Sequence, residues 1–600
     1  MILMSEADDK NGKRGKQSLL LTSSTVRNHL GLRQNGKRCQ LEMRGREAQL
    51  NLSTRPHSLL RLVPENSSNV HPLTAPEGKV DSGKTFEIGQ RSSDELSFAG
   101  LPASVISLGN SFPLGTPICI SPEIVTQLLH YIPPEELSER LTDMYFNSAT
   151  TFHSPIAEPV FRTRILKYVF DSLRNPSSDS ICLYKLSVFY LIMSIGSYVE
   201  GREGIQTLST RNIGSNSYYQ LARASFSVQG LSRATNTWTV ASILLMKYFS
   251  YIASDILSSD QQDFSTLLSQ TIYRIGMHKD PSHWKLDEQD SQDRRIFFWE
   301  ACLHEYSLAI ICGQPMTIDI QFSDCKFAKD TEPNITENGG KETGFRVFVH
   351  QVVAFFLSRT ARIILMKNSN YAELLELDRN FRNFTCPAAL CCPVDFSLDD
   401  KEQRSMFFKN WSSDPRVAFQ QFYASIYLRE LALLHAHRKY VVQAIKLDHH
   451  DPLKTKYGPS ITNAIRSARI LLCALESLAE KHTKHTSQIS FFWASAFSAL
   501  FILGSLALVG PMCASSAEAR ESFEIGVDMF REHRDKEDSY YIALSKLRDN
   551  IRDPTPESND SSKGRSASSY NTIIHMLEGR YGTAYGYTPN CYPSNGLGSM

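Results

Sequence analysis

The chain has 600 residues, of which 42% are hydrophobic and 10% aromatic, so it can bury a large core. Its 64 basic and 63 acidic side chains give a net charge of +1, which excludes binding to nucleic acid or membranes through overall charge. The 12 cysteines are scattered, and the start MILMSEADDK lacks the basic and apolar regions of a signal peptide. We therefore expect a reducing, intracellular compartment.

Residues 1–118 are predicted to be a mostly disordered, basic N-terminal tail. Up to about Leu101 the segment is rich in Ser, Asn, Arg, Gly and Pro, and its apolar residues are too sparse to offset the entropy of ordering. From Met1 to Arg61 there are 12 basic and 5 acidic residues, a net charge of 12 − 5 = +7. The clusters KRGK at 13–16 and GKR at 36–38 have the composition of nuclear-import or phosphate-contact segments, but neither is dense enough to be specific.

An all-α domain, a large multi-helix bundle, is predicted from residue 119 to residue 550. Ser121, Pro122 and Glu123 supply an N-cap, a proline at the first helical position and an acidic first turn. Helical periodicity then continues almost without a break, and convincing period-two strands are absent from the sequence. The predicted helices cover residues 161–173, 181–198, 217–229, 235–254, 263–275 and the stretch that ends before Gly313. The helix over 235–254 repeats apolar residues at spacings of three and four, which predicts one buried face.

The second half of the domain continues this helical pattern. An extended segment over 317–324 and a polar loop over 326–341 precede helices that resume at Phe345. They break around 386–401 and run on to about residue 551, where a disordered tail, 551–600, is predicted. The uncharged stretch 491–514 is long enough for a bilayer, and 181–199 is nearly as apolar. A central helix of a large bundle is also apolar on all sides, so length alone leaves open whether these stretches span a membrane or lie in a core.

The stretch from Asp293 to Cys325 is the most informative feature of the sequence. Acidic residues precede the helix, where they favour the positive end of its dipole. An apolar stripe follows at alternating spacings of three and four, formed by Ile296, Trp299, Leu303, Tyr306 and Ile310. Gly313 tolerates the left-handed conformation after a helix, and Pro315 cannot continue the helix, so both predict its end.

This pattern resembles the regulatory, or middle homology, domain of fungal-specific binuclear zinc-cluster transcription factors. The match rests on Arg294, Arg295, Trp299, Gly313 and Pro315. Residues 271–286, with a turn at Gly276, and the later segments 431–445, 451–472 and 491–505 are similar to other helices of the same domain, so the resemblance spans roughly 119–550. Gln314 stands where family members usually have an arginine.

The zinc cluster of this family is missing from the sequence. Family members read DNA through six N-terminal cysteines that hold two zinc ions, but Cys39 is the only cysteine before Cys119, and no Cys-x-x-Cys pair occurs. No cofactor is therefore expected in this chain, although zinc belongs to full-length members. Three explanations stay open: an incomplete gene model, a regulator that acts through another DNA-bound protein, or a decayed relative that competes for partners.

Other candidate chemistry in the sequence is weak. The acidic and histidine residues at 448–451 and the pair His482 and His485 lack the spacing of a metal site, and both are predicted to lie in loops. Cys386, Cys391 and Cys392 have no nearby base in the sequence, so they are interpreted as unreactive. Usable catalytic, phosphate-binding and dinucleotide-binding motifs are also lacking, and we expect a protein that is not an enzyme.

The resemblance implies a fungal regulator of RNA polymerase II-type transcription, located in the nucleus, whose helical domain controls activity. Its expected partners are DNA, reached indirectly or through a missing N-terminal zinc cluster, other transcription regulators, and a small-molecule effector, but no membrane. Aromatic residues around Trp238 and Trp299 are candidates to line an effector pocket, although such residues are more often core. For Arg294 and Arg295 we expect one to pair with a buried acid and the other to face water. The alternatives are a helical interaction or scaffold protein, or a co-regulator, without DNA binding, and an integral membrane protein.

Overall fold

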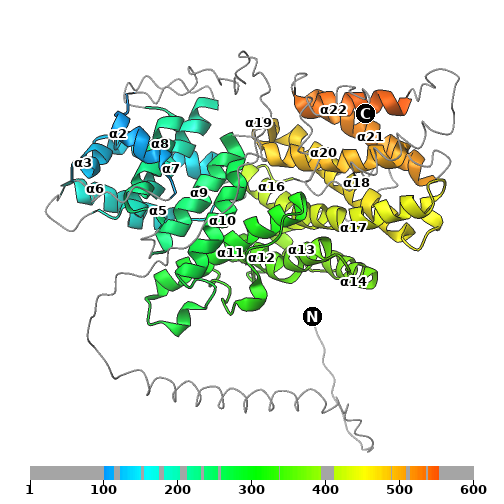
Figure 1. Cartoon of the computed structure of the whole chain (residues 1–600), viewed down its shortest axis with the longest axis horizontal. Helices are drawn as coiled ribbons and strands as arrows, with labels where there is room; N and C mark the ends of the chain where they lie inside the picture. Colours follow the sequence, from blue (N-terminus) through cyan, green and yellow to red (C-terminus); the bar gives the residue numbers. More distant parts are fainter. Residues whose placement is uncertain are drawn as a thin grey trace, which may run out of the picture. The chain divides into compact units, whose positions relative to one another are not determined.

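A computed structural model gives the fold of the chain. The residues it describes are 100–113, 122–149, 154–174, 181–202, 213–231, 236–253, 259–336, 338–392, 411–487, 489–508, 514–534, 538–552 and 577. They belong to one compact unit that begins at residue 91. The prediction of an all-α bundle is confirmed, because nearly every element in these residues is helical (Figure 1).

The first part of the bundle covers the helices up to α11. Its α-helices are α2 (Ala103–Asn110), α3 (Pro122–His130), α4 (Glu135–Met144), α5 (Glu158–Phe161), α6 (Lys167–Arg174), α7 (Leu183–Arg202), α8 (Ser215–Gln229), α9 (Thr237–Ala253), α10 (Ser259–Arg274) and α11 (Glu288–Cys312). The π-helical segments η1 (Tyr145–Ala149) and η2 (Arg162–Leu166) and the 3₁₀ turns η4 (Pro281–His283) and η5 (Ile320–Phe322) connect them. The strands β1 (Asn334–Ile335) and β2 (Lys341–Glu342) form an antiparallel pair in which Asn334 faces Glu342.

The second part of the bundle follows this small hairpin. Its α-helices are α12 (Phe345–Val352), α13 (Ser358–Leu365), α14 (Tyr371–Arg382), α16 (Pro415–Phe422), α17 (Leu428–Leu447), α18 (Gly458–Lys481), α19 (Thr483–Ser487), α20 (Ser490–Leu508), α21 (Ala514–His533) and α22 (Ser539–Arg552). The π-helical segments η6 (Val353–Leu357) and η8 (Tyr423–Tyr427) lie within helical runs, and η7 (Ala388–Leu390) and η9 (Pro452–Lys454) are 3₁₀ turns. As predicted, helices resume at Phe345.

Helix α11 begins and ends where its local sequence signals place it. The side chain of Asp287 accepts a hydrogen bond of 2.8 Å from the backbone N–H of Asp290 and so caps the first turn. At the other end Gly313 adopts the left-handed conformation, with φ of 67°, and donates its N–H to the carbonyl of Ala309. The predicted helix and its stop are therefore confirmed.

The prediction that α9 and α11 each bury a single face is wrong. Every residue from Thr237 to Ser250 is buried, and α11 buries polar as well as apolar positions from Phe297 to Tyr306. The reason is tertiary, because α11 contacts α9, α10, α13 and α17, and α9 also contacts α7 and α20 (Figure 1). These two helices are surrounded, so almost no position is left to face water.

Both predicted tails hold structured residues at their inner ends. Helix α2 lies inside the segment 1–118 and packs on α8, with Val105 and Leu108 buried and Gln220 donating to the carbonyl of Ile106 over 2.9 Å. The folded part therefore starts before residue 119, since a few apolar residues suffice when a partner helix covers them. Within 551–600 the structure describes the end of α22 and the buried Leu577, whose carbonyl accepts from Arg438. The tail residues other than 100–113, 551, 552 and 577 lie outside the described ranges.

Two helical stretches in the described residues are long and apolar enough to cross a membrane by length and composition, 345–365 and Ser490–Leu508. The second of them coincides with most of the predicted candidate 491–514. Most of each apolar window is buried among other helices, 67% and 83% respectively. Core helices of soluble bundles pass the same test, so the apolar character of α20 is explained by its neighbours α18, α21 and α22.

Gly196 of α7 lies where α4 approaches most closely. A Cβ atom at this position would lie 2.2 Å from the carbonyl oxygen of Leu141, which is backbone and cannot move aside alone. We expect Gly196→Ala to lower the free energy of unfolding by about 1–3 kcal/mol or more, measured by denaturant unfolding. Gly201 on the same helix is the matched control, because nothing lies within 4 Å of its added Cβ. If Gly201→Ala lowered the free energy of unfolding as much as Gly196→Ala, the close approach of α4 to α7 would not explain the loss.

Candidate functional site

Trp299 anchors the loop after α11. Its side chain is 5% exposed, and its indole N–H donates to the carbonyl of Lys326 over 3.0 Å. The ring also packs on Phe327, with ring centroids 4.8 Å apart. A buried indole usually needs such an acceptor, so the Trp299 side chain both fills the core and holds the chain after Cys325 in place.

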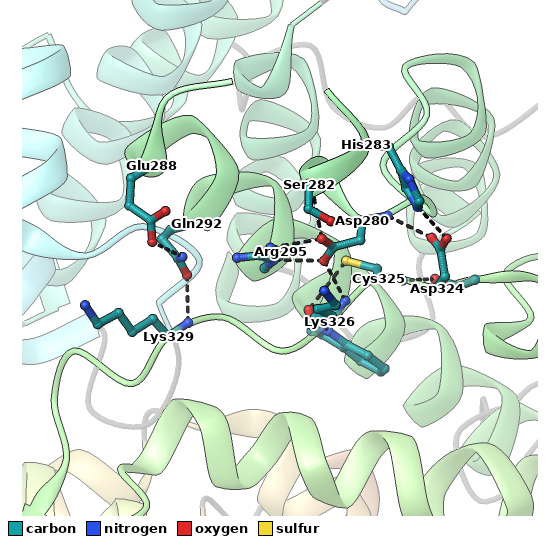
Figure 2. A network of polar contacts seen from close by, with 12 residues as sticks. Asp280, Ser282, His283, Glu288, Gln292, Arg295, Asp324, Cys325, Lys326 and Lys329 are labelled. Atoms are coloured by element: carbon teal, nitrogen blue, oxygen red, sulfur yellow. Dashed lines mark hydrogen bonds and ion pairs between the residues drawn. The ribbon is translucent and has the colours of Figure 1, made fainter. Parts of the chain in front are cut away.

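Arg295 forms a bidentate ion pair with Asp280 (Figure 2). Its Nε and Nη2 atoms donate to the two carboxylate oxygens over 2.9 and 3.0 Å. Asp280 is 1% exposed and also accepts from the backbone N–H groups of Ser282 and Lys326. This carboxylate therefore joins the turn after α10, the helix α11 and the loop at residue 326.

The electrostatics of Asp280 follow from these donors. Burial alone would raise the pKa of its carboxyl group, but the hydrogen bonds from Arg295, Ser282 and Lys326 together hold the pKa well below its usual range. Its own backbone N–H donates to Asp324, whose other carboxylate oxygen lies 2.8 Å from Nε2 of His283 (Figure 2). The network thus runs from a buried ion pair to a half-exposed edge.

Arg294 faces water only in part. Its side chain is half-buried, and Nη1 donates to the carbonyl of Ile275 over 3.1 Å. The guanidinium group lies over the ring of Trp284, 5.4 Å from its centroid. Gly276, with φ of 71°, forms the predicted turn beside it. Both arginines therefore tie α11 to the end of α10, whereas Gly313 ends α11 and Pro315 is exposed.

The Asp and His side chains that could in principle bind a metal do not lie together at one site. Asp448 accepts from the backbone N–H groups of His450 and Asp451 and so forms the expected exposed turn. His482 is the one non-helical residue between α18 and α19, and its Nε2 hydrogen-bonds to the carbonyl of Ser412. His485 lies within α19, so the prediction that it belongs to a loop is wrong. In the described part of the chain, three or more His, Cys, Asp or Glu side chains nowhere gather as a metal site would need.

An apolar pocket lies on another side of α11. It is partly open to solvent, and the empty space within its walls and mouth together is about 850 Å³. Helices α9, α11 and α17, the π-helical segments η6 and η8, and the start of α20 supply its walls. The lining residues are Tyr248, Tyr251, Leu303, His304, Ser307, Leu308, Ile310, Ile311, Cys312, Leu357, Tyr423, Tyr427, Leu428, Leu431, Ala432 and Phe491. Trp238 and Trp299, the aromatic residues expected to line such a pocket, are not among them.

The polar side chains of this pocket are mainly tyrosine phenols, together with Ser307 and His304. Burial raises the pKa of Tyr251, Tyr423 and Tyr427, so their phenols stay protonated. Tyr251 stacks on His304 with ring centroids 5.8 Å apart, and the hydroxyl of Tyr427 lies 2.9 Å from that of Ser495. Asp, Glu, Lys and Arg are absent from the described lining residues. Such a wall suits an uncharged, largely apolar molecule with one or two hydrogen-bonding groups.

Two of the pocket's wall segments are π-helical. Leu357 ends η6, and Tyr423 and Tyr427 bound η8. A π-helical turn inserts an extra residue into an α-helix and often occurs at functional sites, because it re-aims side chains at a cost in hydrogen-bond geometry. The sequence carries no signal for these segments, so it does not predict which residues line this pocket.

A comparison with models of protein families matches the middle of the chain. Residues 143–422 match the family model of the fungal specific transcription factor domain, and the chain therefore contains a domain of this family. The signature residues from Arg294 to Pro315 lie inside the match, which is shorter than the expected span of 119–550. It ends at the last residue of α16, so η8, α17 and α20 contribute pocket walls from outside it. A comparison with curated proteins finds no match for this chain.

The residues present do not fit the binuclear zinc cluster expected for full-length family members. Six closely spaced cysteines would be needed, whereas the sequence has only Cys39 before Cys119. The free cysteines of the described residues are dispersed along the chain, apart from Cys386, Cys391 and Cys392 around η7. We therefore derive no DNA contact through zinc from this chain.

Proposed function

We propose that this protein is a nuclear regulator of RNA polymerase II-type transcription whose helical domain responds to a small, uncharged, largely apolar effector. The match to the fungal specific transcription factor domain supports the regulatory class. That family is a family of regulators, and we propose that the chain is not an enzyme. DNA would be reached through another DNA-bound regulator or through a zinc cluster outside this sequence.

The position of the pocket supports an effector that changes activity. A ligand shifts a protein between two arrangements only as far as it binds one of them better. A molecule in this pocket would touch α11 of the matched domain together with η8, α17 and α20, which follow the match. Its binding free energy would therefore depend on how these two groups of helices pack against each other.

Three proteins test the proposal: the unchanged chain, Ser307→Phe and Ser307→Ala. Ser307 lines the pocket and is half-buried, so a phenylalanine there fills the cavity without displacing a core side chain. With the neutral dye Nile red as probe, we expect saturable binding to the unchanged chain, an affinity about tenfold lower for Ser307→Phe, and little change for Ser307→Ala. Equal dye binding by all three would contradict the pocket assignment.

The regulatory class is tested with the same proteins fused to a foreign DNA-binding module upstream of a reporter gene. We expect nuclear enrichment of the unfused chain and a change in reporter output when the fusion is tethered. A cytoplasmic chain that is inert in this assay would contradict the proposal and would favour a helical scaffold protein. Dye binding and reporter output are separate readouts, so the pocket and the regulatory class can fail independently.

A further inference from the structure

The short turn before α16 brings two cysteines together. Cys386 and Cys391 are half-buried free thiols on either side of η7. The backbone N–H groups of Leu390 and Cys391 both donate to the carbonyl of Pro387, each over 2.9 Å, and fold the turn back on itself. As a result the thiol of Cys391 lies 3.6 Å from the carbonyl oxygen of Cys386, which accepts its hydrogen bond.

The surroundings of this turn favour a thiolate on Cys391. A hydrogen bond from the thiol of Cys386 outweighs burial and, together with the nearby Arg429, lowers the pKa of Cys391 to about 7. The same hydrogen bond raises the pKa of Cys386. Glu342 opposes the effect of Arg429, and Arg429 itself pairs with Glu430 over 2.7 Å. Arg429 of α17 therefore brings, from later in the chain, a positive charge that the local sequence around these cysteines lacks.

We propose that Cys386 and Cys391 form a dithiol redox site that a peroxide converts to an intramolecular disulfide across η7. The Cys391 thiolate attacks one peroxide oxygen, the O–O bond breaks, and Cys391 becomes a sulfenic acid while water leaves. The Cys386 sulfur then attacks the sulfenic sulfur, the S–O bond breaks, and a second water is released. In total two thiols lose two electrons and two protons, and one molecule of hydrogen peroxide is reduced to two molecules of water.

The turn is attached to a wall of the pocket. The backbone N–H of Cys392 donates to the hydroxyl of Ser425, within η8, over 3.2 Å, and the side chain of Gln421 donates to the carbonyl of Ala389 over 3.2 Å. On its other side, the N–H of Ala388 donates to Glu342 over 2.7 Å. A disulfide that tightens the turn therefore acts directly on the segment that carries Tyr423 and Tyr427. The redox site itself does not depend on the proposed effector.

Peptide mass spectrometry of the full chain tests the redox site. The reduced protein is treated with hydrogen peroxide, its free thiols are alkylated, and the peptide containing both cysteines is weighed. We expect this peptide to lose two hydrogen atoms and to resist alkylation at Cys386 and Cys391. In Cys386→Ser the sulfenic acid of Cys391 should persist and react with dimedone, whereas Cys391→Ser should form no disulfide in this turn. Cys473→Ser, at a half-buried thiol on α18, is the matched control and should behave as the unchanged chain.

Alkylation rates at pH 7 give an independent readout. A thiol with a pKa of about 7 is roughly half thiolate at that pH, whereas an ordinary thiol is only a few per cent thiolate, so Cys391 should react about tenfold faster than free cysteine in the same buffer. Equal rates, full alkylation of the turn after peroxide, or a disulfide that uses Cys392 instead would each overturn the proposal.

Discussion

Replacing Trp299 with alanine is expected to lower the free energy of unfolding by about 3–5 kcal/mol. The substitution empties a site that is 5% exposed and removes the ring contact with Phe327. It also removes the indole donor of the Lys326 carbonyl, which then keeps only the weaker thiol donor of Cys325 over 3.6 Å. The change is measured by chemical denaturation followed by circular dichroism.

Two further variants separate the parts of this effect. Trp284→Ala is the control, because that ring is 41% exposed and covers Arg294 at the surface, and we expect a loss much smaller than that of Trp299→Ala. Trp299→Phe keeps an aromatic ring but removes the N–H donor, and we expect it to fall between the other two. An unchanged melting temperature in Trp299→Ala would show that α11 does not anchor the loop that follows it.

The sequence predicts the elements whose causes are local. The beginning and end of α11 depend on Asp287 and Gly313, which act on backbone groups a few residues away, and the helix ends before Gly313 as predicted. The burial of α9 and α11 on all sides depends on neighbours from both halves of the domain, so periodicity within one helix underestimates it. Helix α2 shows the same limit, since its few apolar residues are ordered by α8.

The candidate sites depend even more on contacts between distant segments. The sequence predicts that one arginine of the pair meets an acid, but only the fold identifies Asp280 across the turn after α10. The pocket walls come from five helical runs, and the π-helical segments among them have no sequence signature. Arg429 reaches the cysteine turn from α17, which is why spacing alone indicated unreactive thiols.

Helix α11 connects the two sites that the structure reveals. Arg295 and Trp299 bind the loop at residue 326, whereas Leu303, Ser307 and Ile311 lie one to three turns further along and line the pocket. A helix moves largely as one body, so a shift of its pocket end has to be accommodated where the ion pair holds its other end. The bidentate ion pair between Arg295 and Asp280 therefore holds one end of α11 in place when an effector shifts the end that lines the pocket.

Asp280→Ala is expected to lower the free energy of unfolding by about 3–5 kcal/mol, since it removes one partner of a buried ion pair. Arg295, whose side chain is 14% exposed, would lose its counter-charge, and the N–H groups of Ser282 and Lys326 would lose their acceptor. Asp324→Ala is the matched control, because that carboxylate belongs to the same network but is half-exposed. An equal loss in the two variants would contradict a special role for the buried pair.

The ion pair of Asp280 and Arg295 also predicts how the difference in unfolding free energy between the unchanged chain and Asp280→Ala depends on pH. The pKa of Asp280 is lower in the folded than in the unfolded chain, so the unfolded chain binds more protons and acid favours unfolding. The stabilising effect of Asp280 is fully present above about pH 5, and it is lost as the pH falls through about 4 toward the lowered pKa of the folded state. Unfolding of the unchanged chain and of Asp280→Ala, measured side by side over this range, should give curves that converge at low pH. A difference in unfolding free energy that stays constant over this pH range would contradict the prediction, because it would mean that the pKa of Asp280 is the same in the folded and the unfolded chain.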